Sequence, residues 1–252
     1  MAQTESMRFP GSDGNELAGV LHVPDGSPLG SVLLAHCFTC SKDLHTMSRL
    51  ADGLADVGHE VLRFDFAAVG ESEGEFVDKT VTNNVRDLVA AATALIRRGS
   101  APCAMVGHSL GGAATLLAAE QLKTVRTVAV IGAPSAPSHV GHLFASDEEE
   151  IRRTGSATVQ IANRAFEVSS DFLDDLEKHD QAGQVATLDR PLLVVHAVDD
   201  EVVHVTEGER IFHIARQPKA FLPLLGTDHL VTSRRAAERL SQILVDWLAE
   251  TL

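Results

Sequence analysis

Short apolar runs alternate with longer amphipathic segments along most of the chain. The runs are nearly continuous in apolar side chains, which is typical of strands covered on both faces of a parallel sheet. They span residues 31–38, 59–66, 103–108, 127–133, 191–198 and 219–226. Apolar residues recur at helical spacing over residues 44–57, 81–98, 110–122, 205–215 and 230–252. This alternation predicts an α/β domain with a doubly wound, mostly parallel sheet.

Two parts of the chain depart from the alternation. Residues 6–24 read as an N-terminal antiparallel hairpin, with its turn at residues 11–15. Residues 134–190 contain helix-like pieces but no convincing strand of the central sheet. An insertion of this length is more typical of an active-site lid than of a plain loop, although a peripheral helical decoration has the same pattern. We therefore predict one domain over residues 1–252, with a helical lid inserted at residues 134–190.

The sharpest chemical signal is the sequence Gly107-His108-Ser109-Leu110-Gly111, which follows an apolar run and opens an amphipathic segment. A G-x-S-x-G sequence between a strand and a helix is typical of a nucleophile elbow, a strained turn that exposes a serine. Glycines are needed there because larger side chains would collide with neighbouring elements. The helix dipole and the amide of Leu110 would then face the serine and stabilise an oxyanion.

A serine hydroxyl is a weak nucleophile and needs a base, which in turn needs an orienting acid. Behind such an elbow, the acid and the histidine follow the serine in the chain, each after a late strand. Asp199 and Asp200 follow the fifth apolar run, and His229 follows the sixth. Ser109, one of these aspartates and His229 therefore form a candidate triad. A helix-capping or surface role is the alternative for His229.

Composition narrows the classes of partner. The net charge of −14 disfavours a nucleic-acid backbone or an anionic membrane surface. The first residues carry no basic segment followed by an apolar run, and no apolar run approaches the roughly 20 residues that cross a bilayer. Three unevenly spaced cysteines among 252 residues do not make the framework of a secreted, disulfide-rich domain. The expected location is the cytoplasm.

Cofactor and metal signals are weak. The sequence carries no dinucleotide or nucleotide-triphosphate fingerprint and no paired spacing typical of structural zinc, so we expect neither a cofactor nor a metal. The sequence leaves the chemical state of the Cys37-x-x-Cys40 pair open. Its spacing allows a disulfide or a reactive thiol, and two reduced thiols packed as small apolar side chains are the alternative.

Two further motifs, together with the G-x-S-x-G sequence, make the chain resemble the α/β-hydrolase superfamily over essentially its whole length. Residues 64–74, FDFAAVGESEG, are similar to that family's D-x-x-G-x-G-x-S loop, with Ala67, Ala68 and Val69 in place of the common Arg-Gly-His/Tyr. Residues 196–204, HAVDDEVVH, resemble its H-G-x-x-D-x-x-V-P pattern, which implies Asp200 as the acid and leaves Asp199 as the alternative, one residue out of register.

More narrowly, AHCFTCSKD, HAVDDEVV and GTDHLVT resemble the hydrolase half of bacterial proteins in which an OsmC-like peroxide-reductase domain follows. The resemblance leaves open whether such a second domain was removed or never present.

The resemblance also implies a role for the loop after the first apolar run. In this family that loop supplies the second oxyanion amide, and His36-Cys37-Phe38 occupies the position here. The backbone N–H of Phe38 is then the expected donor beside that of Leu110, and His36 is expected to support the loop by hydrogen bonding. Cys37 stands where glycine is common. A disulfide between Cys37 and Cys40 would reshape this loop, which raises the hypothesis of redox-gated hydrolysis.

These patterns predict a serine hydrolase, carboxylesterase-like, that cleaves small-to-medium acyl esters through Ser109, His229 and Asp200 and an acyl-enzyme. Thioesterases, amidases, peptidases and hydroxynitrile lyases use the same constellation, so they stay open, as does a non-catalytic domain that binds a ligand or protein partner. A haloalkane dehalogenase is disfavoured because its nucleophile is an aspartate. Monomer and homodimer remain equally open. The candidates for the lining of an apolar acyl site are Phe38, Phe144, Phe166, Phe172 and Leu230, and ordinary core or lid packing is an equal alternative for each.

Overall fold

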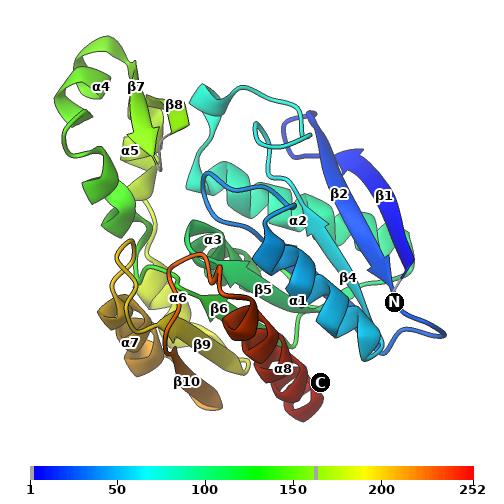
Figure 1. Cartoon of the computed structure of the whole chain (residues 1–252). Coiled ribbons are helices and arrows are strands. Elements are labelled where there is room, and N and C mark those ends of the chain that lie inside the picture. The colour runs from blue at the N-terminus through cyan, green and yellow to red at the C-terminus, as the bar shows by residue number, and fades with distance from the viewer. Residues whose placement is uncertain (1–2, 162–163) are drawn as a thin grey trace.

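An eight-stranded sheet runs through the middle of the molecule, with helices on both faces (Figure 1). The computed structural model describes residues 3–161 and 164–252. The strands of this sheet are β1 (Gln3–Pro10), β2 (Glu16–Val23), β3 (Gly30–Ala35), β4 (His59–Phe64), β5 (Pro102–His108), β6 (Thr127–Ile131), β9 (Leu192–Ala197) and β10 (Lys219–Leu224). They lie in the order β1-β2-β4-β3-β5-β6-β9-β10.

Strand direction confirms the predicted fold class. Every neighbouring pair from β4 to β10 is parallel. Strand β2 pairs antiparallel with both β1 and β4, so the N-terminal hairpin extends the parallel sheet at one edge. The architecture is a doubly wound, mostly parallel sheet with an antiparallel N-terminal hairpin.

The strand order creates a switch point in the middle of the sheet. Strand β3 lies between β4 and β5, so the chain first builds toward one edge and then toward the other. Ligands of open α/β sheets bind in the crevice at the carboxyl ends of strands at such a point. Ala35, at the end of β3, pairs with Gly107, near the end of β5. The loops that follow these two strands therefore start side by side.

Two groups of helices cover the sheet. One face packs against α1 (His45–Asp56) and α8 (Arg234–Thr251). The other packs against α2 (Val81–Arg97), α3 (Leu110–Ala119) and α7 (Val205–Ile214). Alternate side chains of a strand point to opposite faces, so the apolar runs feed both cores. No helix in the described parts of the chain has the length and apolar character needed to cross a bilayer.

The described strands between β6 and β9 form a sheet of their own, and residues 148–176 lie at the upper left of Figure 1. The segment between β6 and β9 consists of the 3-10 helix η2 (Pro137–Phe144), α4 (Glu148–Thr154), β7 (Ser156–Ile161), β8 (Arg164–Ser169), α5 (Ser170–Leu176) and α6 (Gln181–Thr187). The predicted helical pieces are present, and an unpredicted β-hairpin lies between them. Its strands are short and carry no continuous apolar run, so the pattern expected for a central strand does not find them.

Candidate active site

Ser109 lies in a sharp turn between the end of β5 and the start of α3. Its backbone has φ 55° and ψ −128°, a conformation that costs roughly 1–3 kcal/mol for a residue with a Cβ. The Ser109 N–H donates to the carbonyl of Ile131 at 2.9 Å, which ties the turn to the neighbouring strand β6. The turn therefore holds the serine at the N-terminus of α3, at the carboxyl end of the sheet.

Packing explains the two glycines of the motif. A Cβ at Gly107 would overlap the Oγ1 of Thr115 and lie 2.6 Å from the carbonyl oxygen of Gly111. A Cβ at Gly111 would overlap the carbonyl oxygen of His36. The absence of side chains thus lets α3 approach both its own strand and the loop after β3. The first amides of α3 and that loop consequently lie against each other.

The structure connects Ser109, His229 and Asp200 by hydrogen bonds. The Nε2 of His229 lies 2.9 Å from the Oγ of Ser109, and the Nδ1 lies 2.7 Å from the Oδ2 of Asp200. Burial disfavours the Asp200 carboxylate, but the hydrogen bond from His229 and the amides of Val203 and Val202 outweigh this effect and lower the pKa of Asp200. An ionised Asp200 accepts the Nδ1–H of His229, so Nε2 is left as the acceptor for the serine hydroxyl.

Asp199 lies outside this chain of hydrogen bonds. Its side chain is exposed, whereas Asp200 is buried and contacts His229. The geometry therefore brings together the residues that the motif alignment selects and leaves the neighbouring aspartate in solvent.

Two buried histidines are hydrogen-bonded to backbone carbonyls at or near the candidate triad residues, a role that the sequence patterns did not predict. The Nε2 of His108 lies 2.8 Å from the carbonyl oxygen of His229, and the Nε2 of His196 lies 2.8 Å from that of Val203. Burial lowers the pKa of both, that of His108 to about 3, so each ring is neutral and carries one N–H to donate. The available signal was position, because His108 precedes the motif serine and His196 opens the pattern that contains Asp200.

His36 orients the peptide group between Cys37 and Phe38. Its Nδ1 lies 2.7 Å from the carbonyl oxygen of Cys37, and its Nε2 lies 3.2 Å from the amide nitrogen of Phe66. Burial lowers the pKa of His36 to about 3. A neutral ring with one donor and one acceptor meets both contacts only as the Nδ1–H tautomer.

That contact determines where the Phe38 N–H points. In a trans peptide the N–H points away from the C=O, so holding the Cys37 carbonyl directs the Phe38 N–H to the other side. Among the described residues, no acceptor is paired with this N–H. As the first residue of α3, Leu110 also has an N–H without an acceptor inside its helix. These two amides are available to a ligand.

Cys37 and Cys40 are joined by a disulfide, with their Cα atoms 5.2 Å apart. The Cys40 N–H also donates to the Cys37 carbonyl at 3.3 Å, which closes a tight turn. The alternative of two reduced thiols is therefore not the state shown here. The third cysteine, Cys103, is buried.

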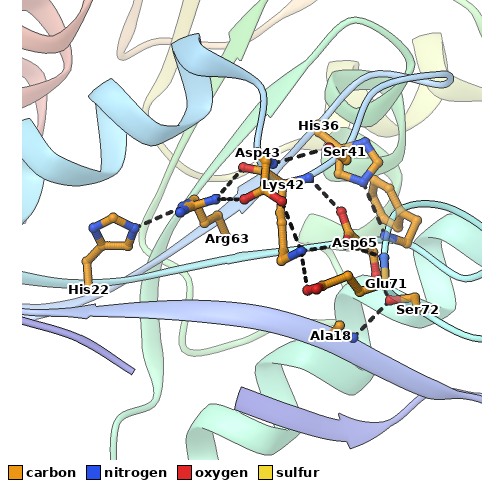
Figure 2. A network of polar contacts seen from close by, with 11 residues as sticks. Ala18, His22, His36, Ser41, Lys42, Asp43, Arg63, Asp65, Glu71 and Ser72 are labelled. Atoms are coloured by element: carbon orange, nitrogen blue, oxygen red, sulfur yellow. Dashed lines mark hydrogen bonds and ion pairs between the residues drawn. The ribbon is translucent and has the colours of Figure 1, made fainter. Parts of the chain in front are cut away.

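A buried ion pair ties the far end of this loop to the segment after β4 (Figure 2). Asp65 accepts the Lys42 N–H at 2.6 Å, the Lys42 Nζ at 2.9 Å and the Glu71 N–H at 2.9 Å. Burial alone would lower the pKa of Lys42, but hydrogen bonds to Glu71 and Asp65 raise it instead. Gly70 has φ 60°, and a Cβ there would overlap the Asp65 carboxylate. The D-x-x-G-x-G-x-S segment thus serves here as the anchor of the loop after β3.

Four of the five predicted pocket residues gather in one aromatic cluster. The Phe38 ring stacks on Phe172 with centroids 4.7 Å apart and meets Phe144 edge-on at 6.1 Å. Phe76, from the 3-10 helix η1 (Phe76–Asp78), connects Phe38 to Phe166. This cluster joins the loop after β3 to the segment between β6 and β9.

Leu230 lies elsewhere, beside an open hollow of about 600 Å³ that also borders His229. Its lining is Asp199, Glu201, Val202, Gly226, Thr227, Asp228, His229 and Leu230. In the part of the chain that the structure describes, no three His, Cys, Asp or Glu side chains are grouped to hold a metal ion.

Several known proteins are similar to this chain in sequence or in structure. A crystal structure of the esterase domain of a Rhodothermus marinus protein is 35% identical, covers 97% of both chains and superposes with a TM-score of 0.80. The uncharacterized protein YfhR of Salmonella typhi is 24% identical over 91% of this chain and 75% of its own length. Lysophosphatidylserine lipase ABHD12 of Danio rerio is 28% identical over 66% of this chain and 42% of its own. The model of the alpha/beta hydrolase family matches residues 32–248. The chain therefore belongs to the alpha/beta hydrolase family.

Proposed function

We propose that this protein is a serine hydrolase that cleaves carboxylic esters through a covalent acyl-enzyme. The observation that supports it most is the unbroken chain of hydrogen bonds from Ser109 through His229 to Asp200, at 2.9 Å and 2.7 Å, with the serine in a strained elbow. Strained residues cluster at active sites, and a purely structural serine has no need of a histidine and a buried carboxylate behind it.

Each residue has a defined role in this mechanism. The Oγ of Ser109 attacks the acyl carbon while the Nε2 of His229 takes its proton. Asp200 holds the Nδ1–H tautomer of His229 and stabilises the imidazolium. The N–H groups of Phe38 and Leu110 donate to the oxygen of the tetrahedral intermediate. His229 then protonates the leaving alcohol, and a water molecule, activated in the same way, releases the acid and restores the serine.

The names of two similar proteins support an ester as the substrate. One is an esterase domain and the other a lysophosphatidylserine lipase. The rings of Phe38 and Phe76, which are the partly exposed members of the aromatic cluster, support an uncharged, apolar acyl group, because aromatic and aliphatic groups pack well against phenylalanine rings. We propose small-to-medium acyl esters as the substrate class. Thioesters and amides, which the same residues can attack, are comparison substrates.

The proposal is tested with p-nitrophenyl esters from acetate to decanoate, on the wild type and Ser109→Ala. Loss of the nucleophile is expected to lower kcat by about 10⁴-fold or more. Ser27→Ala, which changes an exposed serine in the turn before β3, is the matched control and should keep wild-type kcat. The acyl-chain length at which hydrolysis is fastest would indicate the length of the acyl pocket.

Two results would count against this function. If Ser109→Ala hydrolyses these esters within about tenfold of wild type, Ser109 is not the nucleophile. If neither esters nor a parallel set of thioesters and amides is turned over above the Ser109→Ala background, the protein is a binding domain on the same fold.

A further inference from the structure

Lys79 is a buried lysine that contacts the loop after β3. It follows η1 and precedes α2, and its side chain is almost completely inaccessible to solvent. Its Nζ donates to the carbonyl oxygen of Phe38 at 3.0 Å. That carbonyl belongs to the residue whose N–H is the proposed oxyanion donor. Lys79 and His36 thus hold the carbonyls of two successive peptide groups, one on each side of Phe38.

Three aromatic rings surround the ammonium group. The Nζ lies 5.3 Å from the centroid of Phe38, 5.8 Å from that of Phe66 and 5.4 Å from that of Phe76. A cation within about 6 Å of a ring is attracted by its negative face. Together with the Phe38 carbonyl, these rings fix the position of the ammonium group.

Lys79 differs from the other buried lysine of this region. Lys42 forms an ion pair with Asp65 at 2.9 Å. Among the described residues, no carboxylate forms an ion pair with Lys79, and Asp87 and Asp65 attract its charge only from a distance. Burying an ammonium without an ion pair costs several kcal/mol, so simple stabilisation is a poor explanation for this residue.

We propose that Lys79 is a positioning residue for the oxyanion site, which acts through Phe38 by anchoring its carbonyl and by holding a positive charge beside the loop. The inference rests on the proposed function, in which Phe38 donates to the tetrahedral intermediate. An anchored loop is preorganised to donate, and a fixed positive charge nearby favours the negative charge that develops on the substrate oxygen.

The charge of Lys79 changes in the neutral range. Burial lowers its pKa to about 7, although Asp87 and Asp65 partly oppose this effect. Below pH 7 the group is an ammonium, and above pH 7 it becomes a neutral amine, so the positive potential is lost as the pH rises. Of the other groups facing it, His36 stays neutral because its pKa is about 3, and burial raises the pKa of Asp87 to about 6, so Asp87 changes charge at lower pH. The activity is therefore expected to decline on the alkaline side.

Two variants separate the hydrogen bond from the charge. Lys79→Met removes both, and Lys79→Gln removes the charge but keeps an N–H donor, on a side chain that is one atom shorter. Lys123→Met, which changes an exposed lysine after α3, is the matched control. For each protein, kcat and KM are measured on one p-nitrophenyl ester between about pH 6 and pH 9, with hydrolysis by Ser109→Ala subtracted. Hydrogen exchange of the loop at residues 36–42 is measured alongside.

We expect Lys79→Met to lower kcat at pH 6 by about tenfold to a hundredfold, with KM within about twofold. This loss is smaller than the roughly 10²- to 10³-fold loss on removing an oxyanion donor itself, because Lys79 acts through Phe38. Lys79→Gln should lie between Lys79→Met and the wild type. The alkaline decline near pH 7 should be present in the wild type and in Lys123→Met, and absent from both Lys79 variants. Amide exchange in the loop should accelerate in Lys79→Met and change less in Lys79→Gln.

An unchanged kcat, pH profile and loop exchange in Lys79→Met would overturn the proposal, and the same results in Lys79→Gln would do so if the methionine variant does not fold. A wild type without Ser109-dependent turnover would instead refute the proposed function. In that case hydrogen exchange of residues 36–42 still tests whether Lys79 anchors the loop, because this measurement does not depend on activity.

Discussion

Protonation states follow from burial at individual residues of this site. His36 and His108 each have a pKa of about 3, so both are neutral at every pH at which the protein is expected to work. A neutral imidazole has one donor and one acceptor, and each of these rings donates its single N–H to a backbone carbonyl. One carbonyl belongs to the proposed oxyanion loop and the other to His229. The neutral rings therefore fix backbone positions, and His229 remains the proposed base.

Two adjacent aspartates offer a direct test of the acid. Asp200→Asn should lower kcat by about 10⁴-fold, because an asparagine amide in place of the carboxylate favours the wrong tautomer of the histidine. Asp199→Asn removes the same charge one residue away, from an exposed side chain, and should keep kcat within about twofold. Steady-state kinetics on one ester checks both variants, with circular dichroism to confirm folding. Equal losses in the two variants would contradict the assignment of Asp200.

Among the secondary-structure elements, the site depends on where β3 and β5 end. The pairing of Ala35 with Gly107 places the loop after β3 beside the elbow. The loop is then held by the disulfide between Cys37 and Cys40 and by the ion pair between Lys42 and Asp65. Each restraint limits the movement of the Phe38 amide.

Reduction of the disulfide is therefore expected to loosen the loop and lower kcat. The loss should be modest, about threefold to tenfold, because His36, Lys42 and Lys79 still hold the backbone. The double variant Cys37→Ser/Cys40→Ser should have the lower kcat with or without dithiothreitol, whereas Cys103→Ser should respond to it like the wild type. Ester hydrolysis before and after reduction, with thiol titration to confirm reduction, makes the comparison. A wild-type kcat that does not change on complete reduction would refute the redox hypothesis.

At the scale of the whole molecule, the sequence predicted the strands of the central sheet and the order of the candidate triad residues along the chain. It predicted fewer of the contacts that surround the site. Continuous apolar runs identify buried parallel strands, and G-x-S-x-G in a strand–helix setting locates Ser109, because these patterns arise from local constraints. The hairpin β7–β8 was missed because its short strands carry no continuous apolar run. His108 and Lys79 were missed because their partners, the carbonyls of His229 and Phe38, are distant in the sequence. The partner of His196, the Val203 carbonyl, is near in the sequence but is brought to the ring by the fold of the loop after β9. Only the folded chain brings those groups together.

The most direct test of Ser109 as an activated nucleophile is covalent labelling by a fluorophosphonate, followed by intact mass spectrometry and peptide mapping. The serine oxygen bonds to phosphorus and fluoride leaves, which is fast only where a base takes the serine proton and amides stabilise the negative charge on the phosphoryl oxygen. We predict one adduct per chain, on the peptide that contains Ser109, and labelling of His229→Ala slower by about 10³-fold or more. Ser27→Ala should label like the wild type. Absence of an adduct on Ser109, or equally fast labelling of His229→Ala, would contradict the proposed triad.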